Sequence, residues 1–191
     1  MDFLIYSIPD LNAAEIDSSV LSADEREESL KRGRSYTIIR TLLRHEIGRR
    51  NGVSAADISF TYGPHGKPEC AVQHFNISHS GDCLCLAFHN KPIGVDVERI
   101  RPRRFESLAV RFMCAEQLAA FTSRACPQEE FFACWCAAEA LVKHAGDTMW
   151  NAKNYPFTYR HGRIVCLFEQ APVVELFTPQ PGYCGAVAYN K

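Results

Sequence analysis

The sequence predicts a mixed α+β protein that divides into two halves, residues 1–101 and 102–191. Short apolar segments of strand length alternate with long helical stretches, and turn-forming residues separate them. Near the middle of the chain, Arg101-Pro102 interrupts this pattern. A chain of 191 residues is long enough to form two small halves that pack together.

Four segments of the first half have the composition of β-strands, because they are short, apolar and bounded by turn formers. They are residues 3–8, 58–62, 83–88 and 93–97. The turn Asn90-Lys91-Pro92 joins the last two, so we expect them to form a strand pair. Phe75-Asn76-Ile77-Ser78 is a further apolar segment, and it runs into a loop.

One long helix is predicted in the first half. The order Ser22-Ala23-Asp24-Glu25 fits a capping box, which makes Ser22 the N-cap. Apolar residues between Ile38 and Ile47 recur at helical spacing, and the pattern continues to Arg50. Asn51-Gly52 then gives a stop signal.

The second half begins with helices and ends with strands. One helix is predicted over residues 107–121. Another begins after Pro127, since acidic residues stand in its first turn and basic residues precede Gly146 at its end, the charges that a helix dipole favours. Three apolar segments then have strand composition. They are residues 163–168, 173–177 and 183–189.

Charge and hydropathy argue against several classes of function. The formal net charge is −1 and the sequence shows no basic stripe with interleaved aromatic residues, so no nucleic-acid partner is expected. No run approaches the roughly 18 consecutive apolar residues of a membrane-spanning helix, so no membrane partner is expected either. The first residues have no basic leader, which makes a cytoplasmic location the expectation.

The nine cysteines are an odd number in a chain without an export signal, which argues against a disulfide framework. Two pairs have the spacing C-x-C, namely Cys83 with Cys85 and Cys134 with Cys136. Buried, reduced thiols that fill the core are the preferred interpretation. A zinc or redox protein built on these pairs is the alternative, and stoichiometric zinc in the purified protein would support it.

The segment Gly94-Val95-Asp96-Val97-Glu98 carries the first candidate site. Side chains alternate along a strand, so Asp96 and Glu98 emerge on one face while the valines enter the core. Two neighbouring carboxylates repel each other unless a cation lies between them, and Mg²⁺ prefers oxygen ligands. A magnesium site is one interpretation, and a solvated strand end is the other.

The second candidate comprises Trp135, Glu139 and Lys143, which are spaced by four residues and share one helix face. An ordinary exposed Glu–Lys pair is one interpretation. A large tryptophan one turn from the pair, on an alanine-rich helix, instead indicates a partly enclosed site. The third candidate is F-N-I-S-H-S-G at residues 75–81, where hydroxyls, His79 and a glycine could form a turn that contacts phosphate. A structural histidine is the alternative there.

In this order, F-N-I-S-H-S-G, P-I-G-V-D-V-E at residues 92–98 and W-x-x-x-E-A-x-x-K at residues 135–143 resemble the surfactin-type (Sfp-type) 4′-phosphopantetheinyl transferases. Arg40-Thr41-Leu42-Leu43 and Gly66-Lys67-Pro68 are similar to upstream signatures of that family. Pro181-Gly182-Tyr183 is similar to its usual ending. The resemblance covers most of the chain.

The resemblance implies a pseudo-dimer of two similar α+β halves, with coenzyme A and the metal in the cleft between them. By position, the Mg²⁺ ligands would be Asp96, Glu98 and Glu139. The contacts to coenzyme A would come from Arg40, Lys67, Ser78, His79, Asp96 and Lys143. Glu139, Lys143 and Asp96 would form the catalytic set.

The implied reaction is attack of a carrier-protein serine on the pyrophosphate phosphorus that bears the pantetheine arm of coenzyme A, with release of 3′,5′-ADP. A divalent ion and nearby cations would stabilise the charge that builds on the phosphate oxygens. Either Glu139 or a water on the metal would take the serine proton. The implied partner is an acyl or peptidyl carrier protein, and two halves in one chain make a monomer the expectation.

Ala138 departs from the family pattern, which has a lysine at that position, and the turn after Lys143 keeps only Gly146 of the two usual glycines. These departures leave open a relative that binds coenzyme A without efficient turnover. Four arginines follow the strand of Asp96 within six residues: Arg99, Arg101, Arg103 and Arg104. They could steer the docking of an acidic carrier protein, or they could be a solvated face.

Overall fold

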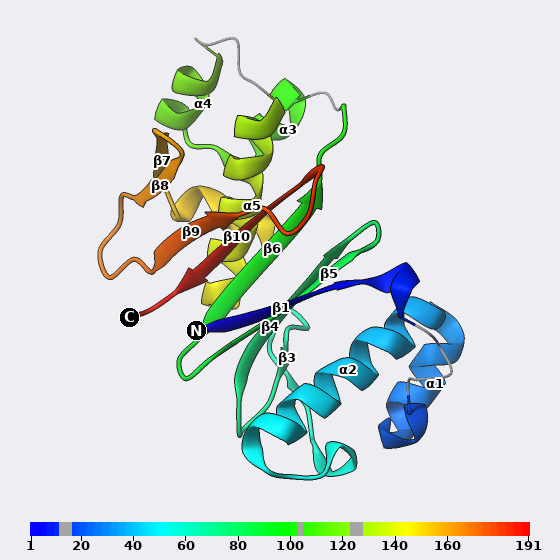
Figure 1. Cartoon of the computed structure of the whole chain (residues 1–191). Helices are drawn as coiled ribbons and strands as arrows, with labels where there is room; N and C mark the ends of the chain where they lie inside the picture. Colours follow the sequence, from blue (N-terminus) through cyan, green and yellow to red (C-terminus); the bar gives the residue numbers. More distant parts are fainter. Residues whose placement is uncertain (12–16, 103–104, 123–127) are drawn as a thin grey trace.

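The computed structural model describes residues 1–11, 17–102, 105–122 and 128–191. It is a mixed α+β structure, as the sequence predicts, and its sheets are antiparallel (Figure 1). One three-stranded sheet has the order β1-β5-β4, and another has the order β6-β10-β9. The strands are Asp2–Ser7 (β1), His74–Ser80 (β4), Cys83–His89 (β5), Ile93–Arg99 (β6), Val173–Phe177 (β9) and Tyr183–Tyr189 (β10).

The sheets correct one expectation of strand pairing. β5 and β6 are consecutive, but β5 pairs with β1 and β4, whereas β6 pairs with β10. Residues 83–88 and 93–97 therefore do not form the expected strand pair. The division at residue 101 stays a prediction, and β6, which precedes it, shares its sheet with β9 and β10 near the end of the chain.

Two short hairpins complete the strands. One joins β2 (Thr61–Tyr62) to β3 (Pro68–Glu69), and the other joins β7 (Phe157–Arg160) to β8 (Arg163–Cys166). The strand expected over residues 58–62 is thus reduced to its last two residues. β7 is a strand that the sequence patterns do not predict.

Two helices replace the single long helix expected in the first half: α1 (Ala23–Arg32) and α2 (Arg34–Asn51). The capping box is confirmed, because the Ser22 hydroxyl accepts from the Glu25 backbone N–H and the Glu25 carboxylate accepts from the Ser22 N–H. The break falls at Gly33, whose φ of 77° lies in the region that favours glycine. α2 ends as predicted, at Gly52 in a left-handed conformation.

The helix expected over residues 107–121 is also two helices, α3 (Phe105–Phe112) and α4 (Ala115–Thr122). The next predicted helix is confirmed as α5 (Gln128–Ala145), with Glu129 and Glu130 in its first turn. The short 3₁₀ helices are Ile8–Asp10 (η1), Ser18–Val20 (η3), Ala55–Asp57 (η4) and Met149–Asn154 (η5). Across the described ranges, no helix combines the length and the apolar character that crossing a membrane requires.

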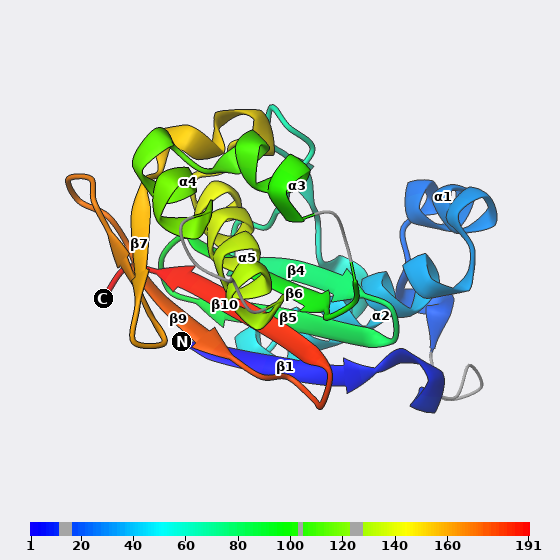
Figure 2. The ribbon, with the colours of Figure 1, turned by 90° about the horizontal axis from the view of Figure 1, so that it is seen from above.

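A long helix packs on each sheet. In the first core cluster, Ile38 and Leu43 of α2 pack with Leu84 and Leu86 of β5. In the second, Leu141 of α5 belongs to the cluster that includes residues of β9 and β10. Figures 1 and 2 show α3 and α4 beside α5, with α2 against the other sheet.

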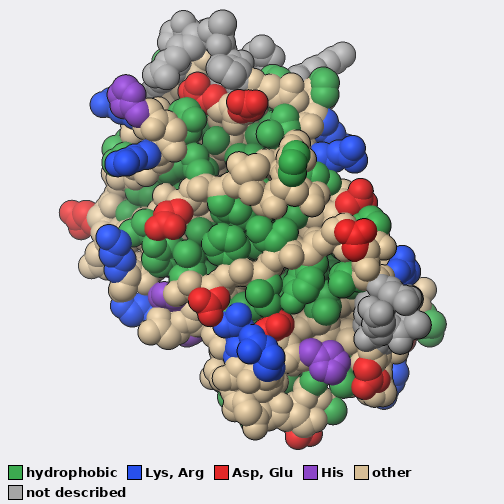
Figure 3. Space-filling model, viewed as in Figure 1, with side chains coloured by type: hydrophobic (Ala, Val, Ile, Leu, Met, Phe, Trp, Pro, Cys, Tyr) green, Lys and Arg blue, Asp and Glu red, His purple; other side chains and the backbone are tan. Residues whose placement is uncertain are grey.

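A third core cluster joins the sheets and includes Cys85 of β5 and Val95 of β6. The rings of Phe3 and Phe177 stack beside it with centroids 4.7 Å apart. Figure 3 shows hydrophobic side chains gathered across the middle of the face that is seen in Figure 1. The cysteines of both C-x-C pairs are no more than 5% exposed, which confirms their expected place in the core.

Candidate active site

The strand β6 carries the two carboxylates of the first predicted motif. In its ladder with β10, Asp96 lies opposite Ala186 and Glu98 lies opposite Cys184. Because side chains alternate along the strand, Asp96 and Glu98 share one face while Val95 and Val97 are buried in the core, as predicted. Asp96 is only 5% exposed, so it is not a residue of a solvated strand end.

Gly94 allows α5 to approach this strand closely. A Cβ atom at residue 94 would lie 2.0 Å from the Ala140 carbonyl oxygen and 2.4 Å from the His144 backbone nitrogen. Only glycine permits this distance between the two backbones. The contact fixes the last turns of α5, where Glu139 and Lys143 stand, against the strand that carries Asp96.

Lys143 forms an ion pair with the Asp96 carboxylate. Its Nζ is 2.7 Å from Asp96 Oδ1 and 3.3 Å from the Val95 carbonyl oxygen, and its side chain is 27% exposed. Burial lowers the pKa of Lys143, but the charges of Asp96 and Glu139 raise it more, so the net pKa shift is upward. Lys143 is therefore not part of an ordinary exposed Glu–Lys pair, because it forms its ion pair with the buried Asp96 of another element.

The carboxylates of Asp96 and Glu98 affect the pKa of Glu139. Burial raises its pKa, Lys143 lowers it, and the charges of Asp96 and Glu98 raise it further, with a net upward shift. Trp135, one turn before Glu139, is partly buried. Its ring meets that of Phe112 edge-on at 5.3 Å and packs against the core cluster around α5.

The acidic residues provide the donor atoms that a hard divalent cation needs. Asp96 Oδ2 is a buried oxygen that has no hydrogen-bond partner among the residues that the structure describes. The negative charges of Asp96 and Glu98 repel Glu139, and a cation would relieve this repulsion. Over the described residues, however, no group of three Asp, Glu, His or Cys side chains is arranged closely enough to hold one ion. The carboxylate oxygens are of the kind that Mg²⁺ prefers. In this structure, the ammonium group of Lys143 is the cation that contacts Asp96 Oδ1.

The segment expected to form a phosphate-binding turn is a strand up to Ser80. The Ser78 hydroxyl is buried and donates to Asp96 Oδ1 at 2.8 Å. His79 is exposed and points to the opposite side of β4, because neighbouring residues of a strand face opposite ways. The structure thus brings Ser78 to the carboxylates but not His79.

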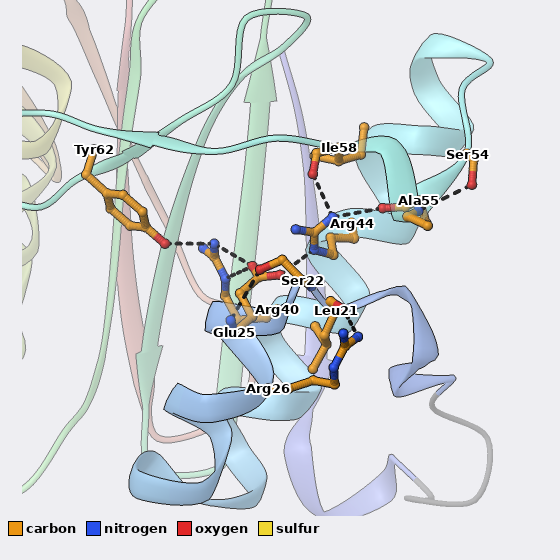
Figure 4. A network of polar contacts seen from close by, with 11 residues as sticks. Leu21, Ser22, Glu25, Arg26, Arg40, Arg44, Ser54, Ala55, Ile58 and Tyr62 are labelled. Carbon is orange, nitrogen blue, oxygen red and sulfur yellow. Dashed lines mark hydrogen bonds and ion pairs between the residues drawn. The ribbon is translucent and has the colours of Figure 1, made fainter.

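Arg40 belongs to a separate buried network (Figure 4). Glu25 lies between two guanidinium groups, with Oε1 2.7 Å from Arg40 Nε and Oε2 2.6 Å from Arg44 Nε. Arg40 also donates to the Tyr62 hydroxyl and lies over the ring of Phe60. Its predicted contact with coenzyme A would have to compete with these partners.

Lys67 joins its loop to the end of α5. Its Nζ donates to the carbonyl oxygens of Ile93 at 3.1 Å and of Lys143 at 2.5 Å. Burial lowers the pKa of Lys67. A pocket of about 460 Å³ lies beside this contact, and its lining includes Lys67, Glu69, His74 and His144. The Nε2 atom of His144 is buried and has no hydrogen-bond partner within the described part of the chain.

The arginine cluster is described only in part. Arg99 and Arg101 are exposed, and Arg103 and Arg104 lie outside the described residues. Ala138 is 2% exposed and belongs to the core cluster around α5, so this part of the helix supplies no cation.

Two residues that shape the site are absent from the predicted set: Ser80, which donates to the Glu98 carboxylate, and Gly94. Polar residues at every second position of β4 are a signal that this strand has a polar face. That signal does not reveal which strand the polar face meets, because β4 and β6 do not share a sheet.

Comparison with known proteins identifies the family. The family model described as the 4′-phosphopantetheinyl transferase superfamily matches residues 92–179. The 4′-phosphopantetheinyl transferase psf-1 of Bacillus pumilus is 32% identical over 181 residues, which is 89% of this chain and 77% of the relative. The chain therefore belongs to the 4′-phosphopantetheinyl transferase superfamily.

Other relatives carry the same enzyme name. A 4′-phosphopantetheinyl transferase of Bacillus subtilis is 30% identical over 154 residues, covering 74% of this chain and 68% of the relative. AcpT of Escherichia coli K12 is 34% identical over 130 residues, covering 63% and 66%. The crystal structure of Thermotoga maritima holo-[acyl-carrier-protein] synthase matches with a TM-score of 0.40 and 18% identity, over 52% of this chain and 64% of that one.

Proposed function

We propose that this protein transfers the 4′-phosphopantetheine arm of coenzyme A to a serine of an acyl or peptidyl carrier protein and releases 3′,5′-ADP. Membership of the transferase superfamily supports the reaction class. The observation that carries the proposal at the level of residues is the contact of Lys143 with Asp96, with Glu139 in the field of the same carboxylate.

Asp96, Glu98 and Glu139 are the proposed ligands of Mg²⁺. When bound there, the ion would withdraw charge from the phosphate oxygens of coenzyme A. The unpartnered oxygen of Asp96 and the mutual repulsion of the carboxylates support this assignment. Lys143 would keep a positive charge beside the reacting phosphates, since its raised pKa keeps the ammonium protonated at neutral pH.

Glu139 is the proposed acceptor of the serine proton. Its raised pKa makes its carboxylate a better proton acceptor than an exposed glutamate, which suits general-base catalysis near neutral pH. Its position on α5, opposite the strand of Asp96, would let it reach a hydroxyl that approaches the phosphorus.

The pocket beside Lys67 is the proposed site of part of the coenzyme A molecule. Its volume of about 460 Å³ suits a nucleoside. Its lining includes Ile93, on the strand that carries Asp96, and His144, the residue after Lys143, so the pocket lies close to the Asp96–Lys143 contact. Lys67 and His79 remain proposed contacts of coenzyme A. Arg40 and Ser78 also remain proposed contacts of coenzyme A, and in the structure they bind Glu25 and Asp96.

We further propose a pseudo-dimeric plan in which the active-site cleft lies where β4, β6 and α5 meet. The exposed Arg99 and Arg101 would attract an acidic carrier protein to this region. The protein would act as a monomer, because one chain supplies every proposed catalytic residue.

Incubation with coenzyme A, Mg²⁺ and several apo carrier proteins, followed by intact-mass measurement, tests the proposal. We expect one carrier serine to gain one phosphopantetheine group. Binding of coenzyme A without any mass gain across acyl and peptidyl carriers would contradict it and would favour a relative without turnover, the possibility that Ala138 raises.

A further inference from the structure

Three polar side chains of β4 hold the backbone of β6. Asn76 Oδ1 accepts from the Val95 N–H at 2.8 Å, Ser78 Oγ from the Val97 N–H at 3.1 Å and Ser80 Oγ from the Arg99 N–H at 3.1 Å. The acceptors are two residues apart on β4 and the donors two residues apart on β6. Side chains thus replace the backbone partners that a neighbouring strand would supply along this edge of β6.

Unlike Asn76, the two serines also bind the carboxylates of β6. Each hydroxyl also donates its proton to a carboxylate of β6, from Ser78 Oγ to Asp96 Oδ1 and from Ser80 Oγ to Glu98 Oε2, both at 2.8 Å. A hydroxyl has one proton and can accept at its lone pairs at the same time, so both bonds can form together. Bonds of this kind to a charged acceptor are stronger than those between neutral groups.

Glu98 depends on this bond more than Asp96 does. Asp96 is buried and is also held by Lys143. Glu98 is partly exposed near the end of β6, and across the described residues Ser80 is the one hydrogen-bond partner of its carboxylate. A glutamate side chain has several rotatable bonds, so without this partner its carboxylate would sample many orientations.

We propose that Ser80 is a positioning residue that orients the Glu98 carboxylate toward a divalent cation. The inference rests on the proposed function, because it takes Glu98 as a metal ligand. Hydrogen bonds to ligand groups commonly change metal affinity by about 10- to 100-fold. Ser80 would not touch the reacting atoms, and its effect on the metal would pass through Glu98. Its second bond, from the Arg99 N–H, holds the backbone of β6, as the Asn76 bond does.

The test compares Ser80→Ala with Ser80→Thr, which keeps a hydroxyl and suits a strand. Asn76→Ala is the matched control, because it removes a bond to β6 of the same kind without touching a carboxylate. Mn²⁺ affinity is measured on the purified proteins by electron paramagnetic resonance. The Mg²⁺ concentration that gives half-maximal transfer and the KM for coenzyme A at saturating Mg²⁺ are measured alongside.

We expect Ser80→Ala to weaken Mn²⁺ binding about tenfold and to raise the Mg²⁺ requirement in parallel, with little change in the KM for coenzyme A. Ser80→Thr should restore both values, and Asn76→Ala should lower the melting temperature while leaving Mn²⁺ affinity unchanged. Unchanged Mn²⁺ affinity in Ser80→Ala, with Mn²⁺ bound normally by the natural protein, overturns this inference alone. A natural protein that binds no Mn²⁺ overturns the metal site and the role of Ser80 together.

Discussion

The Nζ atom of Lys143 lies 2.7 Å from Oδ1 of Asp96. The last turn of α5 thus brings the ammonium group of Lys143 into contact with a carboxylate in the middle of β6. Asp96 and Lys143 are 47 residues apart in the sequence, and the close packing of the helix on Gly94 brings them together. The same packing places Glu139 near both carboxylates of β6. The candidate site therefore depends on the packing of α5 against β6.

Gly94→Ala tests this packing. The new Cβ would lie 2.0 Å from the Ala140 carbonyl oxygen, so α5 would have to move away from β6. We expect a loss of about 1–3 kcal/mol in the free energy of unfolding, or more, together with a large loss of transfer activity. Chemical denaturation and the transfer assay measure the two effects.

Gly63→Ala is the control for that variant. Its Cβ would lie 3.2 Å from the end of the flexible Glu69 side chain, which can move aside. A natural level of stability and activity in Gly94→Ala would show that the close approach of α5 is unnecessary.

Glu25→Gln should be strongly destabilising. The Glu25, Arg40 and Arg44 side chains are each no more than 6% exposed, and the substitution removes the charge that both guanidinium groups share. Removing one partner of a buried ion pair costs about 3–5 kcal/mol. The exposed pair of Lys31 with Glu28 offers the control Glu28→Gln, which should cost less than about 1 kcal/mol. Equal effects of the two substitutions would contradict the structural role of the network.

The same network should make stability sensitive to acid. Burial raises the pKa of Glu25, but the Ser22 N–H and the two arginines lower it more, so its pKa is lower in the folded than in the unfolded chain. A lowered carboxyl pKa adds stability above the ordinary pKa, and that stability is lost as the pH falls through the folded value. We expect Glu25→Gln to flatten the acid side of a plot of unfolding free energy against pH. An unchanged slope in that variant would exclude Glu25 as its source.

Charge reversal at Arg103 and Arg104 tests the docking of the carrier protein. If the arginine cluster attracts an acidic partner, the double variant should raise the KM for carrier protein without changing the KM for coenzyme A. The effect should shrink as the salt concentration rises, because salt screens exposed charges. Equal changes in both KM values would refute a docking role.

Much of the site could be predicted from the sequence, because its signals are local. The alternation around Asp96 and the four-residue spacing of Glu139 and Lys143 fix the faces on which these side chains stand, and both elements are confirmed. The capping box at Ser22 is a local signal of the same kind.

Other features of the fold cannot be predicted from local patterns. The sequence predicts a strand pair for β5 and β6 because they are neighbours along the chain, yet the two strands lie in different sheets. The sequence does not predict the break at Gly33, because a glycine within a helical pattern can also be tolerated. The packing of Trp135 cannot be predicted from its motif, because its ring meets Phe112 of α3, an element that the motif does not contain.

A double-mutant cycle on Asp96→Asn and Glu139→Gln, measured as kcat/KM for transfer to an apo carrier protein, tests most directly whether β6 and α5 form one catalytic unit. Each single variant should stay folded and lose at least about 100-fold, and the double variant should lose little more than the worse of the two, because residues that act together are not additive. Full activity in either single variant, or losses that multiply in the double variant, would contradict the shared site.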